Sequence, residues 1–93
     1  MTARLSLPAR LDLPAAAPLA QELLSLRGSP VTLCGDEVSL LGTPCLQVLV
    51  SARRSWDADG FSLTLTDPSP ALTEQLAVLG FTPADLESTP TEH

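Results

Sequence analysis

The chain has 93 residues and a formal net charge of −6, from 11 Asp+Glu and 5 Lys+Arg. This length suits one domain, and the negative charge argues against nucleic acid and anionic membranes as partners, because both repel it. With one Trp, two Phe and no Tyr, the hydrophobic residues predict a core of Leu, Val and Ala without a large aromatic pocket. Arg10, Asp12, Pro14 and Pro18 interrupt the signal-peptide-like start, so we expect a cytoplasmic protein. No apolar run approaches the roughly 18 residues of a membrane span, so we expect no membrane insertion.

Strand and helix patterns alternate in the first half of the chain. Residues 4–13, "RLSLPARLDL", alternate apolar and polar side chains around Pro8, which predicts two short strands or a hairpin. A helix is expected to begin near residues 15–16, because Pro18 is tolerated only in a first turn. The segment "VTLC" predicts the next strand, and residues 38–41 return the chain to the core.

The corner "LGTPCL" gives a clear local signal for a helix start. Thr43 is a favourable N-cap, and Pro44 is a favourable first helical residue because proline lacks the N–H that stays unpaired there. The helix is expected to run from Pro44 to about Trp56, before the turn that Gly60 permits.

The second half predicts one more strand, one more helix and a tail. Residues 61–66, "FSLTLT", alternate cleanly and predict a strand with one buried and one partly wet face. Ser69 and Pro70 then favour a capped helix. We expect a single domain over residues 1–82 and, in the acidic tail 83–93, at most one helical turn followed by disorder.

This order of elements predicts an α/β layer in which helices connect parallel strands. The Ser/Thr face of the last strand indicates that helices cover mainly one side of the sheet. Catalysis is not expected, because the only histidine, His93, is the terminal residue. Cys34 and Cys45 fit no zinc spacing, so we expect no metal or cofactor; reduced thiols are the expectation, and a disulfide between them stays open.

Three segments, in this order, resemble the STAS domains of bacterial anti-sigma factor antagonists. "LPARLDLPAAAPLAQELL" is similar to the first hairpin and helix of that fold, "VTLCGDEVSLLGTPCLQVLVSA" to its central strand, loop and second helix, and "GFSLTLTDPSPALTEQLAVLGF" to its next strand and capped helix. The resemblance implies a small mixed four-stranded sheet with helices mainly on one face. It also implies truncation at the C-terminus, since the fifth strand and final helix of a full STAS domain are missing. The short form resembles STAS-like proteins of bacterial chemotaxis signalling clusters.

In this family the loop before the second helix carries a phosphoacceptor hydroxyl. Thr43 stands at the first hydroxyl position and is the candidate phosphoacceptor, whereas Pro44 occupies the usual acceptor position and Gly42 replaces an expected Asp. On the residues alone, a plain helix cap is the alternative role for Thr43. A Thr here also resembles the STAS subunit of the lipid-asymmetry transport complex, in which it contacts the transporter ATPase.

The resemblance implies a non-catalytic adaptor or regulator in bacterial signal transduction, of the chemotaxis or sigma-factor type. Its protein partner is then a kinase or a receptor-array component. The alternative is an accessory STAS subunit of a lipid-transport ATP-binding cassette complex, whose partner is the transporter ATPase; a homodimer is left open. The predicted partner interface consists of the loop, the start of the helix and one neighbour: Asp12, Leu41, Gly42, Thr43, Pro44, Cys45 and Gln47.

Two basic side chains adjoin the only tryptophan. Arg53, Arg54 and Trp56 have the composition of interface anchors. In the other interpretation, Trp56 closes the core and the arginines are solvated at the helix end.

Overall fold

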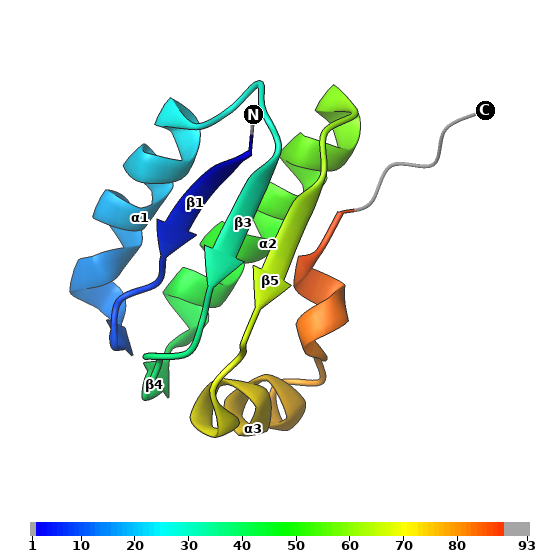
Figure 1. Ribbon diagram of the computed structural model, residues 1–93. Helices are drawn as coiled ribbons and strands as arrows, with labels where there is room; N and C mark the ends of the chain where they lie inside the picture. The colour runs from blue at the N-terminus through cyan, green and yellow to red at the C-terminus, as the bar shows by residue number, and fades with distance from the viewer. Residues whose placement is uncertain (1, 89–93) are drawn as a thin grey trace.

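The computed structural model describes residues 2–88, and its centre is a three-stranded parallel sheet. Strands β1 (Ala3–Ser6), β3 (Val31–Cys34) and β5 (Leu63–Thr66) lie in the order β1-β3-β5. Figure 1 shows the three arrows pointing the same way, with β3 in the middle. The predicted α/β architecture with helical crossovers between parallel strands is confirmed.

Two further short strands form a separate sheet. Residues 4–13 therefore contain two short strands and not a hairpin, and the predicted mixed four-stranded sheet is corrected. β2 (Arg10–Leu11) pairs in parallel with β4 (Leu40–Leu41), and not with β1. The ladder of β1 ends where the Leu7 N–H donates to Cys34 O at 2.9 Å. Pro8 follows and has no N–H to continue the ladder, so the chain leaves the main sheet before β2 begins.

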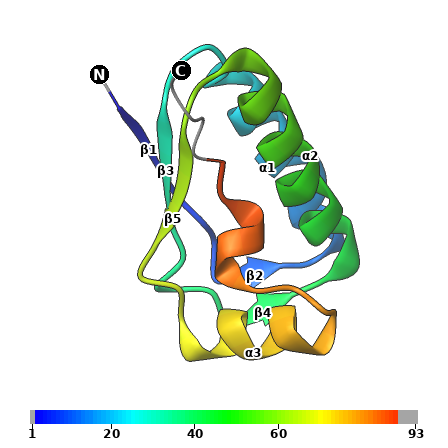
Figure 2. The ribbon, with the colours of Figure 1, turned by 90° about the vertical axis from the view of Figure 1, so that its right-hand side faces the viewer.

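The two long helices cover one face of the sheet. α1 (Leu13–Ser25) and α2 (Thr43–Asp59) lie side by side behind the strands, and Figure 2 shows them on one side of the sheet, while no helix among residues 2–88 covers the other side. The shorter helix α3 (Pro70–Val78) lies across one end, next to β4. The prediction that helices lie mainly on one face therefore agrees with this arrangement.

The alternation of side chains along the strands explains this one-sided cover. Val31 and Leu33 of β3 and Leu63 and Leu65 of β5 are buried, whereas their neighbours on the opposite face are threonines and Cys34. Successive side chains of a strand point to opposite faces, so one apolar face is left for helices to cover. The core is continuous from these strands into leucines of all three helices.

The two long helices begin earlier than their sequence signals suggest, whereas α3 begins at Pro70 after Ser69, as predicted. α1 starts at Leu13 and contains Pro18 in its interior, instead of starting near residues 15–16. Pro14 at its start supplies the favourable first turn, and Pro18 then costs one bond to the carbonyl four residues earlier. For α2, Gly42 is the N-cap, and Thr43 is already the first helical residue.

Part of the predicted tail belongs to the packed structure. Residues Pro83–Leu86 form a 3-10 helix, η1, with Leu86 only 1% exposed. Beyond it, the Ser88 backbone exchanges two hydrogen bonds with Leu63 of β5, at 2.7 and 2.8 Å. The packed domain therefore extends past the predicted boundary at residue 82, and the disorder expected at the end of the tail concerns residues 89–93, outside the described residues.

Trp56 has the structural role that the sequence left open. It is 2% exposed, and its Nε1 donates to Ser29 O at 2.8 Å, so it closes the core beneath the end of α1. Arg53 and Arg54 are exposed. Cys34 and Cys45 are both free thiols, which answers the question of a disulfide.

Candidate functional site

The small β2–β4 sheet brings the starts of both long helices to one place. Leu11 pairs with Leu41, and the next residues, Asp12 and Gly42, are the N-caps of α1 and α2. The Gly42 N–H donates to Leu11 O at 2.7 Å, which extends the parallel ladder to the helix start. Because both strands run in the same direction, both helix N-termini open on the same edge of the molecule.

Glycine at position 42 permits this close approach of the two strands. A Cβ atom there would lie 3.2 Å from Leu11 O, tighter than an ordinary van der Waals contact. Its backbone is in the extended region, so space and not an unusual dihedral angle favours the glycine. The Asp expected here from the family pattern would crowd the same oxygen.

Neither helix start is capped by a side chain, which corrects the predicted role of Thr43. Gly42 has no side chain to offer, and the carboxylate of Asp12 instead accepts from Arg10 Nε at 3.2 Å. Thr43 is exposed, and its hydroxyl has no hydrogen bond to any other residue of 2–88. The plain structural role proposed from sequence, an N-cap, is therefore not the role of this side chain.

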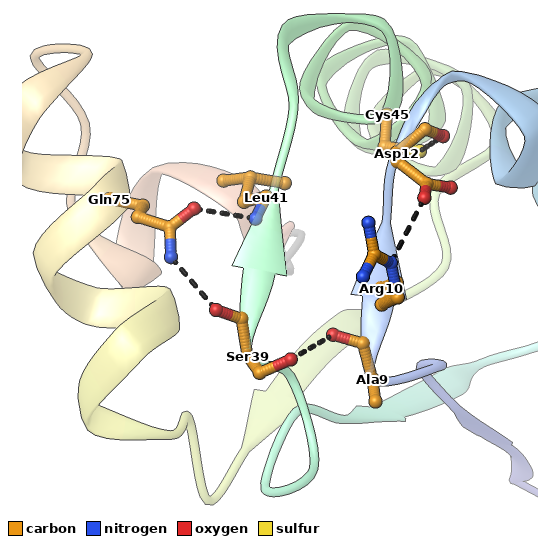
Figure 3. A network of polar contacts seen from close by, with 7 residues as sticks. All are labelled: Ala9, Arg10, Asp12, Ser39, Leu41, Cys45 and Gln75. Atoms are coloured by element: carbon orange, nitrogen blue, oxygen red, sulfur yellow. Dashed lines mark hydrogen bonds and ion pairs between the residues drawn. The ribbon is translucent and has the colours of Figure 1, made fainter.

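Gln75 of α3 fixes β4 from the side away from β2 (Figure 3). Its Oε1 accepts the Leu41 N–H at 2.6 Å, and its Nε2 donates to Ser39 O at 3.1 Å. On the opposite side, the Ser39 hydroxyl donates to Ala9 O at 3.0 Å. One side-chain amide thus pairs with β4 as a neighbouring strand does, and the loop before α2 is held from both sides.

Two residues of the predicted interface lie inside the molecule. Leu41 is 6% and Cys45 0% exposed, and the Cys45 thiol donates to Asp12 O at 3.2 Å. Burial, with a smaller contribution from Asp12, raises the pKa of this thiol, so it remains a protonated donor. Both side chains support the loop from below and are almost inaccessible to solvent.

The remaining predicted residues form an accessible surface, which we call the docking face: Asp12, Gly42, Thr43, Pro44 and Gln47. Thr43 and Gln47 are exposed and the others are partly exposed. The sequence did not single out Leu13, which follows Asp12 and is 70% exposed. An exposed leucine beside two helix starts adds apolar area to this edge of the molecule.

A groove lies on each side of the exposed ridge of α2. One, of about 430 Å³, lies between α1 and α2 and includes Pro44, Gln47 and the exposed Leu24. The other, of about 500 Å³, lies between α2 and the chain that leaves α3, and includes Thr43, Gln47 and Arg54. The docking face is therefore continuous with concave surface on both sides.

Comparison with protein-family models identifies the fold. Residues 1–86 match the family model described as Mlab, STAS domain. The chain belongs to the STAS domain family. Searches of curated proteins and of solved structures gave no significant match.

STAS membership fits the chemistry of the site. STAS domains are generally non-catalytic modules for regulation and interaction, and this STAS domain offers a shaped surface built from helix starts, one hydroxyl and apolar area. Within residues 2–88, no three His, Cys, Asp or Glu side chains are grouped so that they could hold a metal ion. None of the helices in that part of the chain has the length and hydrophobicity of a membrane span.

Proposed function

We propose that this STAS domain is a non-catalytic adaptor that regulates a cytoplasmic signalling protein by binding it through the docking face. The supporting observation is that Thr43 and Gln47 at the start of α2 are exposed, on a segment held in place by the β2–β4 pair and Gln75. A site whose backbone is fixed before binding loses little conformational entropy when a partner binds. The partner class that we favour is a kinase or a receptor-array component.

Phosphorylation of Thr43 is the proposed control of this binding. The hydroxyl is exposed at the first residue of α2, where the helix dipole favours an added negative group. Pro44 lacks an N–H, so a phosphate there has fewer backbone donors than at an ordinary helix start. We therefore expect the added charge to act mainly by opposing a partner that fits the neutral surface.

The second candidate function is that of an accessory subunit of a lipid-transport ATPase. The observation that favours it is the exposed hydroxyl of Thr43 followed by Pro44, because this arrangement resembles the transporter-contacting form of the loop. Both functions use the docking face and differ in the partner. Chemotaxis genes beside the coding gene favour the first function, and transporter genes favour the second.

Thr43→Glu tests the docking face directly. With the variant as bait, we expect affinity purification to recover much less of the partner than with wild type. The expected loss of affinity is at least fivefold, equivalent to roughly 1 kcal/mol, as for truncation of an important interface residue. Thr73→Glu is the matched control, since Thr73 is also an exposed threonine near a helix start and adds the same charge. Equal recovery of the partner by wild type and Thr43→Glu would remove the docking face from the interface.

A further inference from the structure

The groove between α2 and the segment after α3 has a positively charged side chain and no acidic one in its lining. Its lining combines four apolar side chains, Leu46, Val50, Leu79 and Phe81, with Arg54 and the hydroxyl of Thr43. None of the lining residues is acidic, although the chain carries 11 Asp+Glu and a net charge of −6. We call this surface the Arg54 groove.

Arg54 is available for a ligand in a way that the other arginines are not. Arg10 pairs with Asp12, Arg27 pairs with Asp59 at 2.8 Å, and Arg53 donates to Glu87 O at 3.2 Å. Arg4 donates to the Cys34 thiol at 3.1 Å. Within residues 2–88, Arg54 alone among the arginines has no such hydrogen bond or ion pair, and it is exposed.

The apolar part of the groove is accessible too. Leu79 is 40% exposed, and Val50 and Phe81 are only partly buried. Leu46 and Val50 are one helical turn apart on α2, and Thr43 and Arg54 are the first and the last α2 residues in the lining, which we take as its two ends. Along α2 these ends are separated by roughly 16 Å, at about 1.5 Å per residue, a length of about three helical turns.

We infer that the Arg54 groove binds an acidic amphipathic helix of the partner protein, with apolar side chains in the groove and a carboxylate at Arg54. The inference rests on the proposed function, because Thr43 belongs both to this groove and to the docking face. A helix in an apolar groove is a recurrent mode of recognition. A helix with acidic side chains is favoured over one with basic side chains, because the lining has no acidic residue and contains the unpaired guanidinium of Arg54. The α1–α2 groove lacks this feature, since its only arginine, Arg27, is already paired.

A synthetic probe tests this without knowledge of the partner. The probe is a capped amphipathic peptide of about four helical turns, with leucines on one face and glutamates flanking them; the comparison peptide has lysine for every glutamate. Each is titrated into the ¹⁵N-labelled protein at physiological salt, where charges beyond about 8 Å are screened. We expect the acidic peptide to bind more tightly, and to shift the amide signals of Val50, Leu79 and Phe81.

The local and the global charge predict opposite results in this experiment. A net charge of −6 favours the lysine peptide, and Arg54 favours the glutamate peptide. Arg54→Glu is expected to weaken the acidic peptide about fivefold and to strengthen the lysine peptide. Arg53→Glu makes the same charge change one residue away, outside the groove lining, and is expected to preserve the preference of the wild type.

Three results would overturn the inference: equal binding of both peptides, no binding of either, or shifts confined to the α1–α2 groove. Each of these leaves the docking face intact, because that face is tested by recovery of the partner with Thr43→Glu. Conversely, equal recovery of the partner by wild type and Thr43→Glu would reject the docking face, but it would not change the preference for the acidic peptide that the Arg54 groove predicts.

Discussion

The two cysteines show how strongly single-residue chemistry depends on position in this fold. Cys34 lies on the face of the sheet opposite α1 and α2, where its thiol accepts from Arg4 Nη2 at 3.1 Å and is 3.6 Å from Thr66 Oγ1. The hydrogen bond from Arg4, followed by that from Thr66, lowers the pKa of Cys34. Burial raises the pKa of Cys45. The two thiols therefore differ in exposure and in the direction in which their pKa is shifted.

This difference predicts selective alkylation. Iodoacetamide reacts with the thiolate, so it should modify Cys34 of the folded protein before Cys45. The alkylation of Cys34 should also begin at a lower pH than the alkylation of an ordinary thiol. Cys45 should react only after unfolding. Mass spectrometry after peptide digestion, repeated across pH, gives the two profiles. Arg4→Gln removes the main cause of the lowered pKa, so its Cys34 profile should move to higher pH; an unchanged profile would exclude Arg4 as the cause.

At the scale of elements, α3 contributes to the docking face without belonging to it. Gln75 accepts from Leu41 and donates to Ser39, and thereby takes the place of a third strand beside β4. Ser69, the N-cap of α3, accepts the Leu72 N–H, and its hydroxyl donates to Val38 O just before β4. Three hydrogen bonds from α3 and its N-cap thus fix the segment that leads to α2.

Gln75→Ala should lower the free energy of unfolding by about 1 kcal/mol, because the Leu41 N–H loses its acceptor. The loss should not be larger, because Gln75 is partly exposed and water can take the place of the lost acceptor. Urea unfolding measures this change, and Glu74→Ala, at the exposed neighbouring position, is the control. The amide signals of Leu41 and Gly42 should shift in the Gln75 variant alone. A variant as stable as wild type, with unshifted signals, would mean that β4 is held by β2 and not by α3.

Local signals were sufficient for several elements and insufficient for others. Ser69 and Gly60 were predicted correctly as a cap and a turn, because their chemistry acts on residues a few positions away. The pairing of β2 with β4 joins residues 30 apart, and nothing local distinguishes it from a hairpin. The role of Gln75 was equally hidden, since a polar residue beside the apolar stripe of a helix has the pattern of a solvated one.

At the candidate site, too, some features could be predicted from the sequence and others depended on tertiary packing. The sequence predicted that Thr43 and Gln47 would be accessible, and both are exposed. It placed Leu41 and Cys45 on the same surface, because periodicity does not show which side of a corner faces the core. The Arg54 groove escaped prediction for a different reason. Its lining comes from α2 and from residues 79–81, which only the tertiary packing brings together.

At the scale of the whole molecule, the two edges of the main sheet differ. On the outer edge of β5, Ser88 pairs with both backbone groups of Leu63, and the Glu87 carboxylate accepts the Leu65 N–H at 2.9 Å. On the outer edge of β1, no backbone hydrogen bond to another described residue involves Arg4 or Ser6. The segment after η1 thus protects one edge against pairing with another chain, which is a known liability of exposed strands.

Glu87→Ala should expose the edge of β5. We expect faster hydrogen exchange at the Leu65 amide, because its acceptor is lost, and little change at the central strand β3. Exchange measured by NMR reports each amide separately. Glu87→Gln keeps an acceptor oxygen on a side chain of the same length and should retain most of the protection. If the alanine variant exchanges like wild type at Leu65, the carboxylate does not guard this edge.

The shared start of α1 and α2 also has a kinetic consequence. The two helices begin from strands that are joined by the Gly42–Leu11 bond, so no part of the docking face has to fold before a partner arrives. Its rate of association should then follow diffusion and long-range attraction, and not the speed of a conformational search. Differences in affinity among partners should accordingly appear as differences in residence time.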